Sequence, residues 1–483
     1  MKNESMPHWL SKQAMLAPDQ IAIETKEKNL TFLELKRASE QFAKRLSSLG
    51  IKKNSRIAIL SDNRLEMVIA IHAASYLQAV LVLLNIRLTT KELVYQLSKA
   101  KADVIITTDK LREEKKLPHT QMMTYEETMD LPLHEEAMLA THIHLDNPYT
   151  MMFTSGTTGL PKAVLHTYGN HWWSAIASAL NLGLEARDKW LLTLPMFHIS
   201  GFSILMKSII YGMPVHLLDK YDAGHLCEAL QKKSVTLVSL VTVMLRQALD
   251  YFGDDDFPPN IRSILLGGGA VPEALYEKVN EKRVPLIQSY GLTETTSQVA
   301  TLSAADAAKK SGSSGKPLFP AEIKIASPDK EGVGEIWVKG PMVMGGYLND
   351  EKANEKAYED GWFKTGDLGF IDSEDFLYVV DRRSDLIISG GENIYPTEIE
   401  NVILELNEAK EAAVVGQKDD VWGEVPVAFV VAEPTLSEIE LKQHMSERIA
   451  SYKQPKEIFF VESLPRNASN KIMRHQLKKY LEQ

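Results

Sequence analysis

Residues Met151–Thr167, with the sequence MMFTSGTTGLPKAVLHT, carry the most information about how this chain folds. Two apolar flanks, which we expect to be short strands, enclose a run of glycines and hydroxyl residues that ends at Lys162. Glycines let the backbone turn sharply and bring its N–H groups close to a ligand. Successive N–H groups in such a turn form a concave site for an anion. The stretch therefore predicts a loop between two strands that binds a polyphosphate.

A solvated turn is the alternative interpretation, because clusters of Gly, Ser and Thr are usually turns. The spacing Gly156, Gly159, Lys162 also differs from the common nucleotide loop G-x-x-x-x-G-K-[ST], and Pro161 precedes the lysine. The loop alone leaves both interpretations open, so the rest of the chain must decide between them.

The composition indicates a globular protein with more than one domain. Its 483 residues exceed the roughly 250–300 at which a single core stops growing. The net charge of −10 gives no electrostatic footprint for nucleic acid or an anionic membrane. The single cysteine, Cys227, excludes an internal disulfide and fits a reducing compartment, so we expect a cytoplasmic protein. We expect Cys227 in the core rather than as a nucleophile.

An uncharged stretch at residues 67–86 raises the question of a membrane span. It contains His72, Tyr76, Gln78 and Asn85, and this polarity favours a buried helix at about 63–77 followed by a strand. We therefore expect no membrane span. The first twenty residues lack the apolar core of a signal peptide, and no Cys/His cluster has the spacing of a zinc site.

Helices and strands alternate over the first 110 residues and again from 147 to about 380. Thr31 with Glu34, and Thr89 with Glu92, form capping boxes that start helices. The alternation predicts an α/β fold with parallel-rich sheets covered by helices. We expect residues 110–146 to be a variable connection without a strand. From about 382 the pattern predicts a separate small α+β domain.

Further clusters of glycines and polar residues follow the expected strands, where ligands of parallel sheets collect. Each has a plain structural alternative: a buried histidine for His198, a helix start for Thr293, a Gly-flanked turn for Asp367 and a surface lysine for Lys471. A carboxylate near phosphates, such as Glu294, normally requires Mg²⁺ between the like charges. The clusters are LPMFHISG (194–201), LLGGGA (265–270), SYGLTETT (289–296), KTGDLG (364–369), DRRSDLIISGGENIYP (381–396) and LPRNASNKIMR (464–474).

In this order and spacing, TSGTTGLPK, FHISG, GGGA, YGLTET, TGD, DRRSD and NK resemble the adenylate-forming superfamily of acyl-CoA synthetases, nonribosomal-peptide adenylation domains and luciferases. The resemblance covers nearly the whole chain. It implies an enzyme that uses ATP and Mg²⁺ to convert a carboxylate into an acyl adenylate and transfers the acyl group to coenzyme A. It also implies a large domain over 1–381 that binds ATP and the acyl substrate, and a small mobile domain over 382–483 that carries the lysine loop.

The resemblance assigns roles residue by residue. The β- and γ-phosphates would be bound by Thr154, Ser155, Gly156, Thr157, Thr158, Gly159 and Lys162. The rest of the nucleotide would contact Gly268, Gly269, Ser289, Tyr290, Gly291, Asp367 and Arg382, with Tyr290 stacking on adenine and the last two binding the ribose hydroxyls. The catalytic residues would be Lys471, His198, Thr293 and Glu294, of which Glu294 would also bind the metal.

The remaining roles concern the acyl group, coenzyme A and the hinge. The acyl substrate would contact His198, Ser200, Gly201, Gly268 and Ser289, with walls expected at Phe197–Ser203 and Ser239–Thr242. Gly390 and Gly391 would lie at the channel for coenzyme A, and Ser384 would be the hinge.

Three residues depart from the common pattern of the superfamily. Ala163 stands where glycine is frequent, Asn470 precedes the expected lysine in place of glycine, and Ser384 replaces the Asp or Lys often found at the hinge. Asparagine tolerates glycine-like backbone angles, so Lys471 keeps its assignment.

Four longer stretches are most similar to a branch of the superfamily that acts on an aromatic keto-diacid: GNHWWSAIASALNLGL, LPMFHISGFSILMKSIIYGM, DRRSDLIISGGENIYP and LPRNASNK. One carboxylate of such a substrate is activated and the other is only recognised. Because His198 is the one residue of the expected walls that can be cationic, we expect hydroxyls and waters to recognise the second carboxylate. Three alternatives stay open: a fatty-acyl or arylalkanoate CoA ligase, an adenylation enzyme serving a carrier protein, and a nucleotide-binding protein without turnover. A homo-oligomer is also left open.

Overall fold

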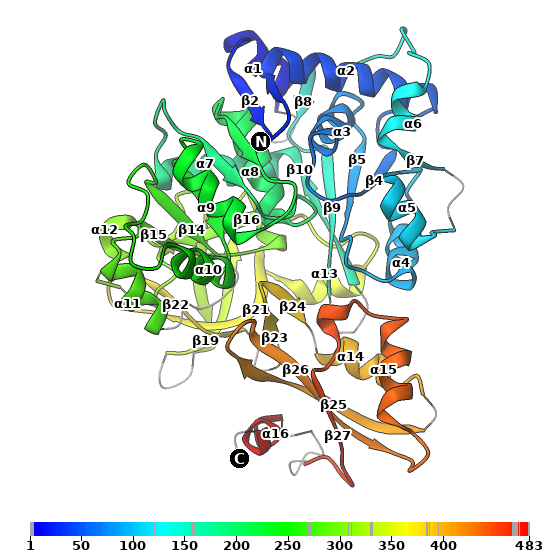
Figure 1. Ribbon diagram of the computed structural model, residues 1–483, viewed down its shortest axis with the longest axis vertical. Coiled ribbons are helices and arrows are strands. Elements are labelled where there is room, and N and C mark those ends of the chain that lie inside the picture. The colour runs from blue at the N-terminus through cyan, green and yellow to red at the C-terminus, as the bar shows by residue number, and fades with distance from the viewer. Residues whose placement is uncertain are drawn as a thin grey trace.

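The computed structural model describes the chain except for residues 1–3, 119–120, 156–160, 268–272, 308, 311, 329–331, 383–384, 386, 395, 407, 466–471, 473 and 482–483. Figure 1 shows a large N-terminal part above a smaller C-terminal part. The fold is mixed α/β with parallel-rich sheets, as the alternating pattern predicts.

Two parallel-rich sheets form the centre of the large part. One has the order β10-β9-β5-β4-β6-β7, in which only β10 is antiparallel to its neighbour. Its strands are β4 (Arg56–Leu60), β5 (Val80–Leu84), β6 (Val104–Thr107), β7 (Met122–Thr124), β9 (Pro148–Ser155) and β10 (Pro161–Thr167). The loop of the decisive stretch thus connects two antiparallel strands, and the prediction that it lies between strands is confirmed.

The second sheet has the order β17-β16-β15-β14-β13-β11-β12-β2-β3, with a parallel centre from β15 to β2. Its strands are β2 (Ile21–Glu24), β3 (Asn29–Thr31), β11 (Trp190–Leu192), β12 (Val215–Leu217), β13 (Leu237–Leu240), β14 (Ser263–Leu266), β15 (Leu286–Leu292), β16 (Ser297–Thr301) and β17 (Lys316–Pro317). The alternating pattern predicts strands in the runs KWLLTLP, PVHLLD, VTLVSLV, SILLGGG and VPLIQSYG, and each of these runs overlaps one strand of this sheet.

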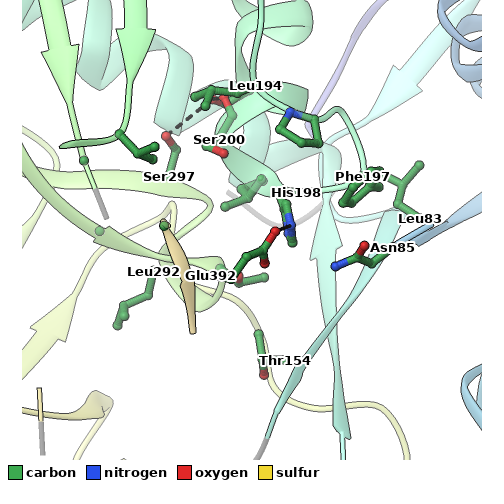
Figure 2. A pocket seen from close by; sticks show the side chains of 18 of the residues that line it. Leu83, Asn85, Thr154, Leu194, Phe197, His198, Ser200, Leu292, Ser297 and Glu392 are labelled. Atoms are coloured by element: carbon green, nitrogen blue, oxygen red, sulfur yellow. Dashed lines mark hydrogen bonds and ion pairs between the residues drawn. The ribbon is translucent and has the colours of Figure 1, made fainter. Parts of the chain in front are cut away.

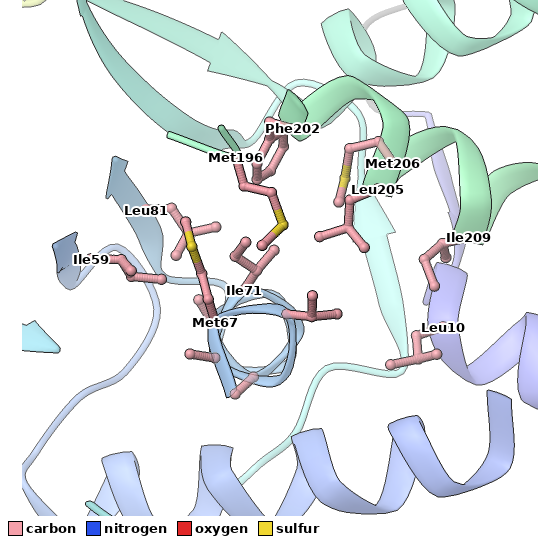
Figure 3. Close-up of a cluster of buried hydrophobic side chains, with 14 of the residues drawn as sticks. Leu10, Ile59, Met67, Ile71, Leu81, Met196, Phe202, Leu205, Met206 and Ile209 are labelled. Atoms are coloured by element: carbon pink, nitrogen blue, oxygen red, sulfur yellow. The ribbon is translucent and has the colours of Figure 1, made fainter. Parts of the chain in front are cut away.

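The core between the two sheets is built around α3 (Leu65–Tyr76), which is apolar on nearly every side. Figure 3 shows α3 end-on, with Met67 and Ile71 directed toward Met196, Phe202 and Leu205. A helix that is hydrophobic all round is a buried one, so the prediction of a buried helix in the uncharged stretch is confirmed. Among the helices of the described residues, none is both long and apolar enough to cross a membrane.

The other helices of the large part cover the sheets. Those that begin at the two expected capping boxes are α2 and α4, and both boxes are formed. The helices are α1 (Trp9–Leu16), α2 (Phe32–Ser48), α4 (Thr90–Ala100), α5 (Asp109–Lys115), α6 (Tyr125–Asp130), α7 (Tyr168–Leu182), α8 (Ile199–Tyr211), α9 (Ala223–Lys232), α10 (Thr242–Phe252), α11 (Glu273–Glu281), α12 (Ala304–Ala307) and α13 (Glu351–Ala357).

An antiparallel sheet and the C-terminal part complete the fold. The antiparallel sheet contains β18 (Glu322–Ala326), β19 (Gly334–Lys339), β20 (Tyr358–Glu359), β21 (Trp362–Ile371) and β22 (Leu377–Arg382). The C-terminal sheet contains β23 (Ile387–Ser389), β24 (Glu392–Ile394), β25 (Ala409–Asp419), β26 (Gly423–Ala432) and β27 (Glu457–Phe460). Its helices are α14 (Pro396–Ile403), α15 (Glu438–Ser446) and α16 (Arg474–Leu481), with a short turn η2 (Ser451–Lys453).

Two expectations about local structure are wrong. Residues 110–146 contain β7, which joins the first sheet, and β8 (His142–His144), which pairs with β1 (Ser5–Pro7). Strands of three residues are too short to produce a readable alternation. The Gly-flanked segment around Asp367 is not a turn, because Asp367 lies inside β21. The positive φ of 76° at Gly366 is accommodated within this strand.

Candidate active site

A cavity of about 300 Å³ lies where the carboxyl ends of the two large sheets meet the C-terminal part. Strands β5 and β9 contribute one wall, and the segments after β11, β13, β14 and β15 contribute the other. The third wall comes from the β23–β24 turn and η2. Nine of the expected site residues line this one cavity: Thr154, His198, Ser200, Ser289, Gly291, Thr293, Glu294, Gly390 and Gly391. Figure 2 shows several of them around its centre.

The expected phosphate loop begins beside this cavity. In the β9–β10 ladder, Lys162 lies opposite Thr154. The Lys162 ammonium lies 4.8 Å from the centre of the Tyr347 ring. Gly156, Thr157, Thr158 and Gly159 lie outside the described residues, as does the side chain of Ser155.

Glu294 is the middle residue of the turn η1 (Thr293–Thr295) and lies beside Thr154 of β9. Its Oε1 accepts hydrogen bonds from the Tyr347 hydroxyl at 3.0 Å and, more weakly, from the Thr154 hydroxyl at 3.5 Å. Burial raises the pKa of this carboxyl, and nearby Asp367 raises it further, while Tyr347 and Lys162 lower it.

The surroundings of Glu294 fit a magnesium ion. Among the described residues no ammonium or guanidinium lies within 4.0 Å of its carboxylate, and no cluster of three or more His, Cys, Asp and Glu exists that could hold a metal alone. A bound divalent cation would compensate the buried charge, and Mg²⁺ typically takes one or two protein carboxylates and fills its shell with phosphate oxygens and water.

A chain of hydrogen bonds through two neutral histidines and a threonine supports the backbone of η1. His166 Nε2 lies 2.7 Å from the Thr293 carbonyl and must donate to it. Burial lowers the pKa of His166 to about 4, so Nδ1 is unprotonated and accepts from the Thr150 hydroxyl at 3.0 Å. Thr150 in turn accepts from His171 Nε2 at 2.9 Å. Thr293 and Glu294 therefore rest on a fixed hydrogen-bonded support that the sequence pattern did not reveal.

Tyr290 and Asp367 form a pair at the back of the nucleotide region. The Tyr290 hydroxyl donates to Asp367 Oδ2 at 2.7 Å, and the Tyr290 ring is only 4% exposed. Neither residue lines the cavity. Asp367 lies opposite Arg382 in the β21–β22 ladder, so the two residues assigned to the ribose hydroxyls are neighbours in the sheet.

The wall expected for the acyl group is largely present. Phe197 to Ser200 and Ser203 line the cavity, and so do Ser239 to Val241. Gly201 does not line the cavity. A Cβ at Gly201 would lie 2.3 Å from the carbonyl oxygen of Pro195, so this glycine lets α8 begin directly against the preceding segment.

The tip of the β23–β24 hairpin brings the C-terminal part into the cavity. Gly390 and Gly391 form its turn with φ values of 57° and 85°, a conformation that favours glycine at both positions. A Cβ on Gly391 would lie 2.9 Å from the side chain of Val241, so the hairpin tip packs closely on the large part. The next residue, Glu392, accepts a hydrogen bond from Arg87 at 2.9 Å. It also accepts one from His198 at 3.2 Å, and Figure 2 shows this contact.

A second, buried ion cluster joins the two parts behind the hairpin. Lys453 of η2 donates to Glu398 at 2.7 Å and to Glu92 of α4 at 3.0 Å. Burial alone would lower the pKa of Lys453, but Glu398 and Glu92 raise it above its ordinary value. The sequence motifs did not assign Arg87, Glu92 or Lys453 to the site, because the contacts Arg87–Glu392 and Glu92–Lys453 join residues more than 300 positions apart.

Lys471, Ser384, Gly268 and Gly269 lie outside the described residues. Leu464 and Ile472 pack with Leu477 of α16 against Phe429. Figure 1 places α16 at the end of the C-terminal part that is remote from the large part.

Comparison with known proteins agrees with this geometry. Residues 10–348 match the AMP-binding enzyme family, and residues 398–471 match the AMP-binding enzyme C-terminal domain. The chain belongs to the AMP-binding enzyme family. The superfamily resemblance is thereby confirmed.

The narrower resemblance of the four longer stretches is to o-succinylbenzoate–CoA ligase of menaquinone biosynthesis, and it is confirmed too. The 2-succinylbenzoate–CoA ligase of Oceanobacillus iheyensis is 48% identical over 99% of this chain and 100% of that protein. The o-succinylbenzoate CoA synthetase of Bacillus subtilis is 45% identical.

Two structures of the B. subtilis synthetase differ in how closely this chain follows them. A double mutant bound to a product analogue superposes with a TM-score of 0.93, covering 99% of both chains. The complex with the acyl-adenylate intermediate covers 98% of both chains but has a TM-score of 0.76. The chain therefore follows the arrangement of the product-analogue complex more closely.

Proposed function

We propose that this protein is an AMP-forming acid–thiol ligase that converts o-succinylbenzoate, ATP and coenzyme A into o-succinylbenzoyl-CoA, AMP and pyrophosphate. The observation that carries the proposal is the full-length likeness to enzymes named for this reaction, at 48% identity. The cavity supports it, because it gathers nine residues assigned to ATP, the acyl group and coenzyme A.

In the first step the succinyl carboxylate attacks the α-phosphorus of ATP, and pyrophosphate leaves. Both partners are anions, so the site must offset their repulsion. Residues 154–159 and Lys162 would hold the β- and γ-phosphates, and Thr293 would contact the α-phosphate. Glu294 would hold Mg²⁺, which supplies positive charge at the phosphates. Lys471 would bridge the α-phosphate and the substrate carboxylate, and Asp367 and Arg382 would bind the ribose.

In the second step the thiol of coenzyme A attacks the acyl carbon, and AMP leaves with the former carboxylate oxygen. The thiol proton is lost to a base or to solvent. The hairpin tip at Gly390 and Gly391 lies against Val241 at the cavity, and this position supports the proposal that pantetheine enters there. No protein nucleophile is needed. Cys227 is buried and outside the cavity, and burial raises its pKa to about 12.

The two steps require different arrangements of the small domain. We propose that residues 382–483 turn about Ser384 after adenylate formation, so that Lys471 leaves the cavity and the β23–β24 hairpin enters it. The remote position of α16 and the presence of Glu392 beside His198 support the thioester-forming arrangement for this structure. We also propose a cytoplasmic location, because the lone cysteine fits a reducing compartment.

The decisive assay supplies ATP, Mg²⁺ and coenzyme A with o-succinylbenzoate, palmitate or coumarate in parallel, and detects the thioester by mass spectrometry and pyrophosphate by coupled assay. We expect o-succinylbenzoyl-CoA as the preferred product. A preference for palmitate or coumarate would contradict the proposal that o-succinylbenzoate is the acyl substrate. A product formed only on a carrier protein, or no ATP–pyrophosphate exchange at all, would overturn the reaction.

A further inference from the structure

The segment that contains Tyr347 crosses η1 and β10, the two elements that flank the expected phosphate site. The Met344 N–H donates to the Glu294 carbonyl of η1 at 2.8 Å. Four residues further on, the Leu348 N–H donates to the Ala163 carbonyl of β10 at 2.8 Å. The segment therefore joins the element that carries the expected metal ligand to the strand that carries the expected phosphate lysine.

The side chain of Tyr347 makes one contact to each of these elements. Its hydroxyl donates to Glu294 Oε1 at 3.0 Å, and the centre of its ring lies 4.8 Å from the Lys162 ammonium. Tyr347 is only 9% exposed and does not itself line the cavity. One buried side chain thus contacts both the carboxylate expected to hold the metal and the ammonium expected to hold the phosphates.

Helix α13 holds Tyr347 in place. Its Asn354 accepts a hydrogen bond from the Tyr347 N–H at 2.7 Å and donates one to the Tyr347 carbonyl at 2.9 Å. A Cβ on the preceding Gly346 would lie 2.9 Å from the Asn354 side chain, so the segment packs directly on the helix. Val164 and Phe363 belong to the same small core as the tyrosine. A side chain fixed in this way can orient its partners precisely.

The hydroxyl contact decides which oxygen of Glu294 is available to a metal ion. Both of its side-chain hydrogen bonds, from Tyr347 and from Thr154, go to Oε1. Within the described part of the chain, Oε2 accepts from no side chain, and Glu294 lines the cavity. Outer contacts of this kind fix the orientation of a ligating carboxylate, and their loss typically weakens metal binding or activity roughly 10- to 100-fold.

The ring contact has a different consequence. Lys162 is close enough to Glu294 to lower the pKa of its carboxyl, so the two opposite charges attract each other. A lysine side chain is flexible, and a contact with the face of an aromatic ring gives its ammonium a defined position. Tyr347 therefore directs the ammonium over its ring face and the carboxylate to its hydroxyl, which leaves both charges for the ligand.

We propose that Tyr347 is a positioning residue of the site for the metal and the triphosphate. Its hydroxyl fixes the Glu294 carboxylate for Mg²⁺, and its ring fixes the Lys162 ammonium for the β- and γ-phosphates. AMP lacks both of these phosphates, so its binding should not depend on Tyr347. This inference rests on the proposed function and adds a residue to which the superfamily resemblance assigned no role.

Calorimetric titration of the full chain tests the inference with two ligands, a non-hydrolysable ATP analogue with Mg²⁺ and AMP without metal. Tyr347→Phe removes the hydroxyl and keeps the ring. We expect its affinity for the analogue with Mg²⁺ to fall roughly 10- to 100-fold, with the affinity for AMP unchanged. In adenylate formation the half-maximal Mg²⁺ concentration should rise, while the rate at saturating Mg²⁺ stays near that of the wild type.

Tyr347→Leu removes the ring as well and isolates the second contact. In the absence of metal it should bind the ATP analogue roughly 2- to 30-fold more weakly than Tyr347→Phe, the range of one cation–π contact. In a Lys162→Met background the Phe and Leu variants should bind equally, because no ammonium then remains to be positioned. A difference that persists in this background would contradict the role of the ring.

Tyr276→Phe is the matched control. Tyr276 is 7% exposed, its hydroxyl donates to the Gln288 side chain at 2.5 Å, and neither residue lines the cavity. This variant should keep both affinities and the Mg²⁺ requirement of the wild type, because the lost hydroxyl contacts no group of the phosphate site.

The outcomes separate this inference from the proposed function. If Tyr347→Phe loses affinity for AMP as much as for the analogue with Mg²⁺, the tyrosine is merely structural and the inference is wrong. An unchanged Mg²⁺ requirement would overturn it too. If the wild type binds the analogue with Mg²⁺ but does not use o-succinylbenzoate, the proposed substrate is wrong, and the loss in Tyr347→Phe still supports the role of Tyr347.

Discussion

His198 and Glu392 are 194 positions apart in the chain, yet the imidazole Nε2 and the carboxylate Oε1 lie 3.2 Å from each other. Arg87 adds a second contact to the same carboxylate at 2.9 Å. Burial opposes ionisation of Glu392, but His198, Arg87 and Lys453 together lower its pKa to about 2. At neutral pH an ionised carboxylate of the small domain is therefore held by cationic and imidazole groups at the floor of the cavity.

Replacing this carboxylate should affect one half-reaction only. Glu392→Gln removes the charge that attracts Arg87, and each charge-assisted hydrogen bond contributes about 1.5–3 kcal/mol. We expect the rate of thioester formation from preformed adenylate to fall roughly tenfold, with adenylate formation unchanged in single-turnover assays. Glu405→Gln is the control, because its bond to Lys91 also joins the two parts but is exposed. Equal loss in both half-reactions would contradict the assignment.

The buried cluster around Lys453 allows a closely matched pair of variants. Glu92 and Glu34 are both the third residue of a helix with a formed capping box, and Gln is accepted there. Only Glu92 also bonds to Lys453 of the small domain. Glu92→Gln should slow the thioester step and destabilise this arrangement by about 1–3 kcal/mol, whereas Glu34→Gln should not slow it. Similar behaviour of the two variants in half-reaction kinetics would show that the cluster does not hold the domains.

Lys471 should matter in the other half-reaction. We expect Lys471→Ala to reduce adenylate formation by on the order of 10²–10³, the usual effect of losing one donor to developing charge. Thioester formation from preformed adenylate should survive. Lys478→Ala, on a partly exposed face of α16, serves as the control and should leave both steps intact. Pyrophosphate exchange and thioester release, measured separately, would reveal an equal loss if the role were wrong.

The burial of Lys207 predicts a pH dependence of stability. Its pKa is about 7 in the folded protein against 10.5 in the unfolded chain, so the unfolded chain binds more protons between these values, and unfolding free energy rises with pH there. Lys207→Met lacks this penalty. The free energy of unfolding of the variant should therefore exceed that of the wild type most at about pH 7 and below. This difference in stability should shrink toward about pH 10. Urea denaturation across this range would show a constant difference if Lys207 were not desolvated.

Much of the fold was readable from the sequence because local signals agree with the final structure. The apolar runs RIAIL and LVSL predict buried strands, and both form them. The capping box of Thr31 and Glu34 lies within four residues, so it can be recognised from the sequence alone. The failures have equally local causes. The three-residue strands β7 and β8 are too short to show a period, and Gly366 looks like a turn residue although it lies in a strand.

The site was readable only where its residues lie in motifs. Thr154, His198, Thr293 and Gly390 each belong to a glycine- or hydroxyl-rich cluster, and all four line the cavity. Tyr347 belongs to none of these clusters, and nothing in the chain around it shows that Glu294 and Lys162 are adjacent to it. Pairings of that kind depend on the packing of sheets and domains, which no local pattern encodes.

The central claim is that one cavity brings two mutually repelling anions together at the β9–β10 loop and η1. A crystal structure of the protein with a non-hydrolysable ATP analogue and Mg²⁺ tests this most directly. The account predicts the triphosphate beside residues 154–162, with the metal ion on Glu294 and the α-phosphate near Thr293. A triphosphate bound anywhere else, or a metal ion that does not contact Glu294, would contradict it.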